Sequence, residues 1–185
     1  NRLGDAASAA IVRAASKMPR LDLLDISLND LDALAAEAVR ELLGHKGCVV
    51  RTLVMQRADV DDEECARLCA SLERNNSLTA LDLAHNAIGA AELENFVKPE
   101  LVTGGEAIAE MLPVTVKLVT LDVSWNLLRG DSACALADGL AENASLRTLR
   151  LDYNTFHETA TQRLGEALHR NRTLRTLSLQ YNNVT

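Results

Sequence analysis

Aromatic residues are scarce in this chain: two phenylalanines, two tyrosines and one tryptophan occur among 185 residues. A core built from a few large side chains is therefore excluded. The apolar residues make up 48% of the chain and are mostly leucine and alanine, so they must pack through many small, regular contacts. The near-zero mean hydropathy is typical of a globular domain and argues against a disordered or membrane-spanning chain. This composition favours helices or repeats.

Cysteine is also sparse, and no two cysteines form a C-x-x-C pair. The four residues are Cys48, Cys65, Cys69 and Cys134. Cys65 and Cys69 lie four residues apart on a predicted helix, but no nearby His or Cys pair completes a metal site. We therefore predict no metal and no cofactor, and interpret the cysteines as small buried residues in a reducing compartment.

Basic residues are outnumbered by acidic ones, 19 to 26, which gives a formal net charge of -7. An acidic surface repels phosphate backbones and anionic lipid headgroups, so we expect neither a nucleic acid nor a membrane as partner. No N-terminal apolar stretch resembles a signal peptide. The chain also lacks a phosphate loop, a zinc signature and a hydrolase motif. We predict that it is not an enzyme and has no catalytic residues.

The main feature of the sequence is an internal repeat. The pattern is L-x-x-L-x-L-x-x-N-x-L, and one clear copy consists of Leu118, Leu121, Val123, Asn126 and Leu128. The asparagine position recurs at residues 1, 29, 58, 86, 126, 154 and 182, with alanine at 58. The step between copies is 28 or 29 residues, except for one step of 40. A period of this length predicts stacked units that share one continuous core.

Each unit predicts a short strand, a turn and a helix. The L-x-L alternation buries one face of a strand, and apolar residues spaced by four, such as Leu136 and Leu140 or Leu164 and Leu168, mark one face of a helix. Stacked units predict an α/β solenoid in the shape of a horseshoe, with a parallel sheet on the concave face and helices on the convex face. The repeat asparagine should satisfy backbone groups of neighbouring turns, and Ala58 interrupts that ladder once.

These repeats resemble the ribonuclease-inhibitor-like class of leucine-rich repeats over nearly the whole chain. The class includes ribonuclease inhibitor, the sensing domains of Nod-like receptors, the activators of the Ran GTPase, the tropomodulin C-terminal domain and several cytoskeletal or ciliary scaffold subunits. The resemblance implies an intracellular, protein-binding scaffold, which places the chain in the cytoplasm with a cytoskeletal or ciliary assembly as one setting. It does not choose among these members.

We predict a single repeat array over residues 1–185. Neither end supplies the polar cap that a solenoid needs, so we expect a piece of a longer array. The long step predicts an inserted loop at residues 92–103, beside the rim of the sheet. Its apolar residues are Phe96, Val97, Leu101 and Val102. They either pack back on the solenoid or meet a partner.

Side chains that alternate with the buried leucines should point out of the sheet, about 4.8 Å from their equivalents in the next repeat. The column just before the repeat asparagine holds the only tryptophan and both tyrosines, although the core does not need them there. Tryptophan, tyrosine and arginine are the residue types enriched at the centres of protein interfaces. We predict that this column binds a partner through Arg57, His85, Trp125, Tyr153 and Tyr181. The alternative is that these side chains pack against one another along the rim.

A second outward column adds three charged residues to the predicted partner-binding set. Asp82 and Asp122 should be adjacent like charges, which costs stability unless something compensates, and Arg150 is the expected neighbour of Asp122. The acidic pair either receives a basic side chain of the partner or forms a solvated face.

Asparagine sequons begin at Asn75, Asn143, Asn171 and Asn183. The first three share one repeat position at the turn from helix to strand, where asparagine tolerates the left-handed backbone. We therefore interpret them as turn residues and not as glycosylation sites.

The pattern as a whole predicts a scaffold that binds another protein along the concave face and its rim. The alternative is a regulatory or sensing module of a larger switch protein, such as a nucleotide-dependent receptor or a GTPase activator. A purely architectural spacer in a filament or cilium is a third reading.

Overall fold

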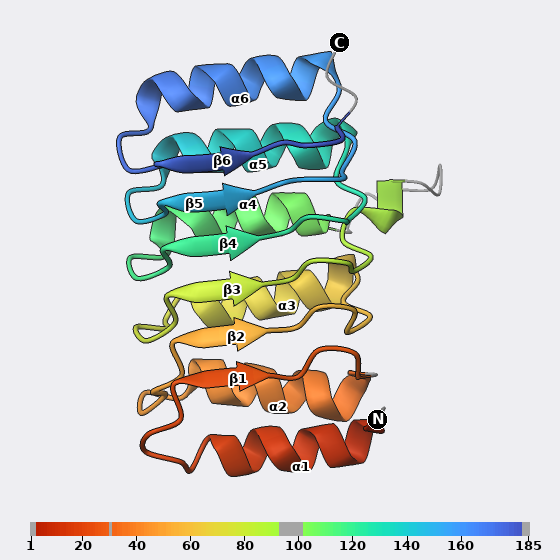
Figure 1. The fold of residues 1–185 in the computed structure, drawn as a ribbon, viewed down its shortest axis with the longest axis vertical. Helices are drawn as coiled ribbons and strands as arrows, with labels where there is room; N and C mark the ends of the chain where they lie inside the picture. Colours follow the sequence, from red (N-terminus) through yellow and green to blue (C-terminus); the bar gives the residue numbers. More distant parts are fainter. Residues whose placement is uncertain (1–2, 30, 93–101, 183–185) are drawn as a thin grey trace.

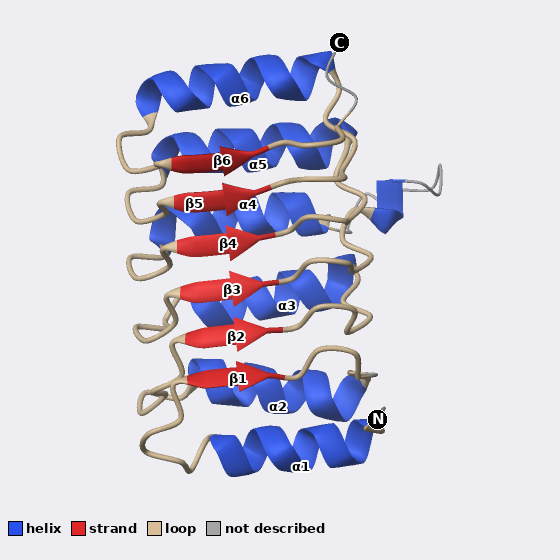
Figure 2. Ribbon diagram, in the orientation of Figure 1, coloured by secondary structure: helices blue, strands red, loops and turns tan. Residues whose placement is uncertain are grey.

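A computed structural model describes residues 3–29, 31–92 and 102–182. A sheet and a row of helices form two layers (Figures 1 and 2). The parallel strands follow one another in chain order and are β1 (Leu23–Asp25), β2 (Thr52–Val54), β3 (Ala80–Asp82), β4 (Thr120–Asp122), β5 (Thr148–Arg150) and β6 (Thr176–Ser178). The helices are α1 (Asp5–Ala15), α2 (Ala33–Gly44), α3 (Asp62–Leu72), α4 (Gly104–Val114), α5 (Gly130–Glu142) and α6 (Glu158–Arg170), with a short 3-10 helix η1 (Ala90–Glu92).

This arrangement confirms the predicted α/β solenoid. Each helix carries the chain back so that the next strand can join the sheet in parallel. The middle leucines of the strands, such as Leu121 and Leu149, are paired in register and fully buried. The sheet therefore presents the same repeat position of every unit in one straight column.

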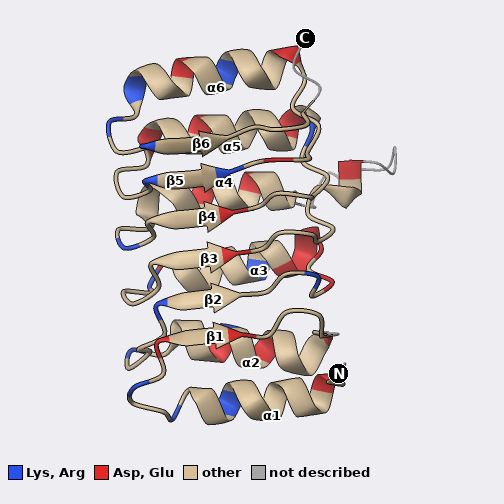
Figure 3. Ribbon diagram, viewed as in Figure 1, with Lys and Arg blue, Asp and Glu red and all other residues tan. Residues whose placement is uncertain are grey.

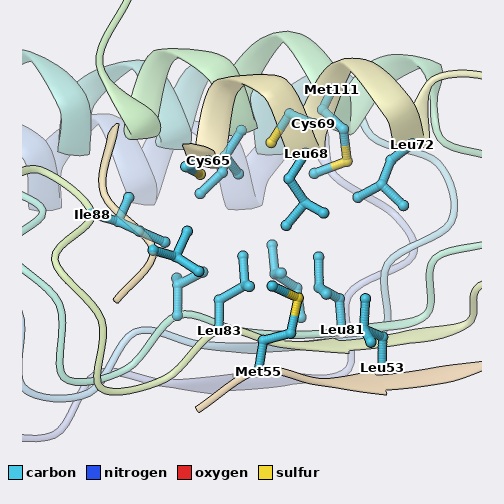
Figure 4. Close-up of a cluster of buried hydrophobic side chains, with 14 of the residues drawn as sticks. Leu53, Met55, Cys65, Leu68, Cys69, Leu72, Leu81, Leu83, Ile88 and Met111 are labelled. Carbon is cyan, nitrogen blue, oxygen red and sulfur yellow. The ribbon is translucent and has the colours of Figure 1, made fainter. Parts of the chain in front are cut away.

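The core is built mostly from leucine and alanine side chains, as the composition predicted. Leucines of the strands face leucines and cysteines of the helices across the two layers (Figure 4). Cys65 and Cys69 lie in this core, where a hydrogen bond with Cys69 and burial together raise the pKa of the Cys65 thiol. Cys48 and Cys134 are only half-buried. Within the described ranges, no cluster of three or more His, Cys, Asp or Glu residues could hold a metal ion.

One predicted helix position differs. Leu140 of α5 is fully buried, but its repeat equivalent in α6, Leu168, is 39% exposed. The buried residues of α6 are instead Ala160, Leu164 and Ala167. Helix α6 packs against α5 on one side only within the described chain. Leu168 therefore stays partly open to solvent.

The predicted asparagine ladder is present. Asn126 donates to the backbone oxygens of Leu83 and Val123 and accepts from the N–H of Ile88, at 2.9, 3.1 and 3.0 Å. Asn154 repeats this pattern one unit later, with Val123, Leu151 and Leu128. Since one asparagine joins two neighbouring turns, the ladder holds the strand-to-helix turns at a fixed spacing.

Ala58 leaves a gap in the ladder, and a change in the backbone accompanies it. The Asn86 side-chain oxygen accepts from two backbone N–H groups of this turn, those of Ala58 and Val60, at 3.0 and 3.1 Å. Asp59 lies in the left-handed region with a φ of 55°. The neighbouring asparagine and a local backbone shift thus compensate for the missing side chain.

Asn75, Asn143 and Asn171 are turn residues, but the predicted left-handed backbone is wrong for them, and Asn183 lies outside the described residues. Asn143 and Asn171 have φ values of -71° and -66° and an extended ψ. Each side-chain oxygen instead accepts from the backbone N–H groups two and three residues later, at 2.7 to 3.0 Å. Asn75 does the same with Ser77 and Leu78. Because these side chains are buried and hydrogen-bonded, the turns need no positive φ.

The ends of the predicted insertion are anchored by carboxylates. The buried carboxylate of Asp62 accepts from the backbone N–H groups of Gly89, Ala91 and Gly104 at 2.6 to 2.8 Å. Glu92 ends η1 and accepts from the N–H of Ser132 at 2.7 Å, at the start of α5. Thr103, the predicted last residue of the loop, caps α4 through a capping box with Glu106.

The predicted loop contains several apolar residues. Val102 is 43% exposed. Phe96, Val97 and Leu101 lie outside the described residues.

Candidate partner-binding rim

The column before the repeat asparagine forms one rim of the sheet. We call it the rim column, and its members are Leu28, Arg57, His85, Trp125, Tyr153 and Tyr181. All six have a positive φ, between 49° and 60°. This left-handed backbone costs roughly 1–2 kcal/mol for a residue with a Cβ atom. Leu28 and Arg57 share this conformation although neither is aromatic. The repeat therefore imposes the conformation, and the aromatic side chains do not cause it.

Hydrogen bonds between repeats stabilise this backbone. The N–H of Trp125 donates to the oxygen of Asp152 at 2.7 Å, and the N–H of Tyr153 donates to the oxygen of Gln180 at 2.8 Å. These bonds continue the ladder of the sheet beyond the ends of the strands. The rim column is therefore held at sheet spacing and its side chains point in a common direction.

Four rings of the rim column stack on one another. The ring centres of His85 and Trp125 are 4.9 Å apart, those of Trp125 and Tyr153 are 3.6 Å apart, and those of Tyr153 and Tyr181 are 4.4 Å apart. The interplanar angles are 13° to 15°. We call these four residues the aromatic stack. Each pair contributes about 0.5–1.5 kcal/mol beyond its buried area, which offsets part of the backbone cost.

The aromatic stack is open to solvent at its edge. Trp125 is 45% exposed and Tyr181 is 73% exposed, while His85 and Tyr153 are half-buried. Since the ring faces cover one another, a partner would meet ring edges and their polar groups. Desolvation and the neighbouring Tyr181 raise the pKa of the Tyr153 hydroxyl above its ordinary value.

A hollow of about 550 Å³ lies beside the aromatic stack on the sheet face. His85, Trp125 and Tyr153 form one wall of the hollow. The remaining lining residues are Gln56, Ala84, Asp122, Ser124, Arg150, Asp152, Thr176, Leu177, Ser178 and Gln180. The hollow thus combines flat apolar surface with charges of both signs.

The predicted charge pairs lie where the register places them. Asp82 and Asp122 are register partners on β3 and β4, and Arg150 is the partner of Asp122 on β5. The guanidinium of Arg150 is 3.6 Å from the Asp122 carboxylate. The amide of Gln56 donates to Asp82 at 2.6 Å. Each carboxylate of the acidic pair therefore has its own compensating partner.

One polar group in the hollow lacks such a partner. Ser124 is only 6% exposed, and its hydroxyl forms no hydrogen bond with any described residue. A buried hydroxyl left unpaired costs roughly 1–3 kcal/mol.

Not all of the predicted residues come together. Five of the eight line the hollow, namely His85, Asp122, Trp125, Arg150 and Tyr153, and Tyr181 extends their stack. Arg57 is exposed further along the rim column, and Asp82 lies beside the hollow without lining it.

The predicted binding set left out one further outward position of each repeat, which supplies Gln56, Ser124, Asp152 and Gln180. This position was recognisable in the sequence, because each of these residues directly precedes a rim residue and follows an apolar residue of the repeat. Asp152 is the most connected of them. Its carboxylate accepts from the Ser178 hydroxyl and the Gln180 N–H, both at 2.6 Å.

Comparison with known proteins agrees with this geometry. A model of the family described as "Leucine Rich repeat" matches residues 74–91 and 170–185. Each matched segment includes a strand-forming part of the repeat and its asparagine. The fold is a leucine-rich repeat solenoid. The family name denotes a repeat module and no catalytic domain.

Two solved structures of leucine-rich repeat architecture are similar to this solenoid. Leiomodin-1 Actin-Binding Site 2 has a TM-score of 0.57 and 20% identity, and the match covers 88% of each chain. The tropomodulin C-terminal domain of Caenorhabditis elegans has a TM-score of 0.57 and 17% identity, over 91% of this chain and 93% of that one. At these identities the similarity concerns the fold.

A curated human protein, "NACHT, LRR and PYD domains-containing protein 3", is 32% identical over 80 residues. This match covers 43% of this chain and 7% of the human protein.

None of the described helices is both long enough and apolar enough to cross a membrane.

Proposed function

We propose that this solenoid is a protein-interaction scaffold whose partner binds at the aromatic stack and the adjoining hollow. The observation that carries the proposal is the continuous stack of four rings beside a hollow that contains the Asp122–Arg150 pair and an unpaired Ser124 hydroxyl. Rigid aromatic side chains with polar edges are the usual anchors of protein interfaces, because little conformational entropy is lost on binding.

The arrangement favours a partner with both apolar and polar contacts. Ring edges, the tyrosine hydroxyls and the indole N–H provide hydrogen-bond donors along the rim. The exposed guanidinium of Arg150 and the carboxylate of Asp152 provide one charge of each sign in the hollow. We further propose that the repeats are of the ribonuclease-inhibitor-like class and that the scaffold works in the cytoplasm, in keeping with the repeat length near 28 residues.

A photo-crosslinking experiment tests this proposal. The exposed Gln180 is replaced by p-benzoylphenylalanine, and adducts formed in cell extract are identified by mass spectrometry. We expect one dominant protein adduct, which the double substitution Trp125→Ala with Tyr153→Ala weakens by about tenfold or more, the equivalent of one hot-spot contact. The substitution also removes the three stacking contacts, each worth about 0.5–1.5 kcal/mol, so circular dichroism should first show that the double variant is folded at the temperature of the assay.

The matched control is Leu28→Ala, which removes an exposed side chain from the same repeat position with the same left-handed backbone but outside the stack. Equal adduct yields from the double variant and this control would contradict the proposal. A crosslinker at the exposed Leu168 of α6 reports on the opposite, helical layer and should give a different adduct or none.

A second candidate is a sensing module within a larger switch protein. The partial similarity to the human NACHT-, LRR- and PYD-containing protein favours it. In that case the crosslinked partner should be a nucleotide-binding domain, and its nucleotide exchange or hydrolysis should change when the solenoid is added. An adduct with an unrelated protein, unaffected by nucleotide, would argue for the plain scaffold.

A further inference from the structure

The opposite edge of the solenoid carries a separate charge pattern. The last three turns from helix to strand, residues 115–119, 143–147 and 171–175, contain four basic residues and no acidic residue. We call these four the basic edge: Lys117, Arg147, Arg172 and Arg175. All four are exposed, and Figure 3 shows their segments at the end of the molecule where the strands begin. This is unusual for a chain whose formal charge is -7.

Helix capping does not explain the basic edge. A basic residue in the last turn of a helix is stabilised by the partial negative charge there, and Arg170, which pairs with Glu142, is such a residue. Arg147 and Arg175, by contrast, directly precede strands β5 and β6. Within the described residues, no ion pair joins any of the four to a carboxylate, whereas Arg51 at the equivalent position pairs with Asp22.

Two of these arginines are immediate neighbours in space. The backbone N–H of Arg175 donates to the oxygen of Arg147 at 2.8 Å, so the two side chains leave adjacent turns at the same repeat position. Like charges at directly opposed positions are destabilising. Because neither arginine is paired with a carboxylate, a bound anion would relieve the repulsion between Arg147 and Arg175.

The turns that display these side chains are rigid. Asn171 donates to the oxygens of Leu140 and Asn143 at 2.8 and 3.0 Å, and the hydroxyl of Ser145 donates to the oxygen of Thr115 at 2.8 Å. These side chains connect each turn to the next. The basic edge is thus preorganised, which lowers the entropic cost of binding.

We infer that the basic edge is a second docking surface and that its occupant is an acidic segment of another protein. Two exposed valines, Val114 and Val116, at 50% and 66%, stand among the basic residues and favour a polypeptide with interleaved acidic and apolar side chains. A single-stranded nucleic acid would need aromatic platforms for its bases, and none of the described residues of these turns is aromatic. A membrane surface would need larger apolar anchors than two valines.

Fluorescence anisotropy with a labelled peptide that alternates glutamate with valine and serine tests this inference. We expect saturable binding at low salt that weakens as salt is raised. The double reversal Arg147→Glu with Arg175→Glu should weaken binding by about tenfold or more, while Arg147→Lys with Arg175→Lys should retain most of it.

The matched control is Arg13→Glu with Arg67→Glu, which changes the net charge by the same amount at two exposed sites on helices. It should weaken peptide binding less than about threefold, because the charges lie away from the edge. Circular dichroism confirms that each variant is folded.

Three outcomes would overturn the inference. They are no peptide binding, an equal loss in the control pair, and binding of phosphatidylserine vesicles or single-stranded DNA at this edge in place of the peptide. The variant Trp125→Ala with Tyr153→Ala should bind the peptide normally, because the aromatic stack lies on the other edge. The two surfaces can therefore fail independently.

Discussion

At the scale of single residues, the rim column has an unusual backbone. Leucine, arginine, histidine, tryptophan and tyrosine all occupy the left-handed region there, although glycine and asparagine are the residues that favour it. Interstrand hydrogen bonds outweigh the local preference of these side chains. This conformation directs the rings away from the core and aligns them. The backbone conformation that the repeat imposes therefore determines the geometry of the candidate site.

The titration of Tyr153 is a test at this scale. In Tyr181→Phe it is the only tyrosine of the chain, and burial should keep its ultraviolet titration midpoint above the ordinary value of about 10. Since the folded state raises this pKa, the neutral phenol contributes stability that is present below pH of about 10 and is lost as the pH rises through the folded pKa.

The melting temperature of the wild type should accordingly fall more steeply above pH of about 10 than that of Tyr153→Phe. A titration midpoint at or below the ordinary value would show that the stack does not shield this hydroxyl.

At the scale of the elements, the asparagine ladder joins one turn to the next. Asn126→Ala removes four buried hydrogen bonds and leaves the oxygens of Leu83, Val123 and Ser124 with one donor fewer. We expect a loss of about 2–4 kcal/mol in the free energy of unfolding, measured by urea denaturation.

Asn76→Ala is the matched control for that substitution. This asparagine is exposed, and its side chain makes one long hydrogen bond of 3.4 Å to the oxygen of Arg74. Its loss should cost less than about 0.5 kcal/mol. If both substitutions had the same effect, the ladder would not be a main source of stability.

At the scale of the whole molecule, stability should vary along the solenoid. Each unit contacts only its neighbours, so the protection of a strand depends on the units beside it. Leu149 and Leu151 of the β5 unit are fully buried, whereas Leu177 and Leu179 of the β6 unit are only half-buried. Native-state hydrogen exchange should show the slowest amides in β3 to β5 and faster exchange in β6. Uniform protection across all the strands would contradict this gradient.

The fold was predictable from the sequence because the period of 28 to 29 residues carries it. The alternation of apolar residues places every described strand, the repeat asparagine supports all of these except β2, and the outward columns follow from the parallel register. The alignment of Asp82 with Asp122, and of Asp122 with Arg150, was predictable for the same reason.

The parts that were not predictable depend on side-chain hydrogen bonds without a fixed sequence signature. The left-handed rim was missed because no glycine or asparagine marks it. The extended turn at Asn143 and Asn171 was missed because asparagine suits both conformations. Asp62 holds three backbone N–H groups that are 27 to 42 residues away in sequence, a distance that no local pattern reveals.

The position of Trp125 between two other rings has an optical consequence. It is the only tryptophan of the chain, and it lies in contact with His85 on one side and Tyr153 on the other. Its emission therefore comes from a single, known place in the molecule and responds to charge and water at that place. Occupancy of the hollow can be followed by ultraviolet excitation of the native chain, without any attached dye.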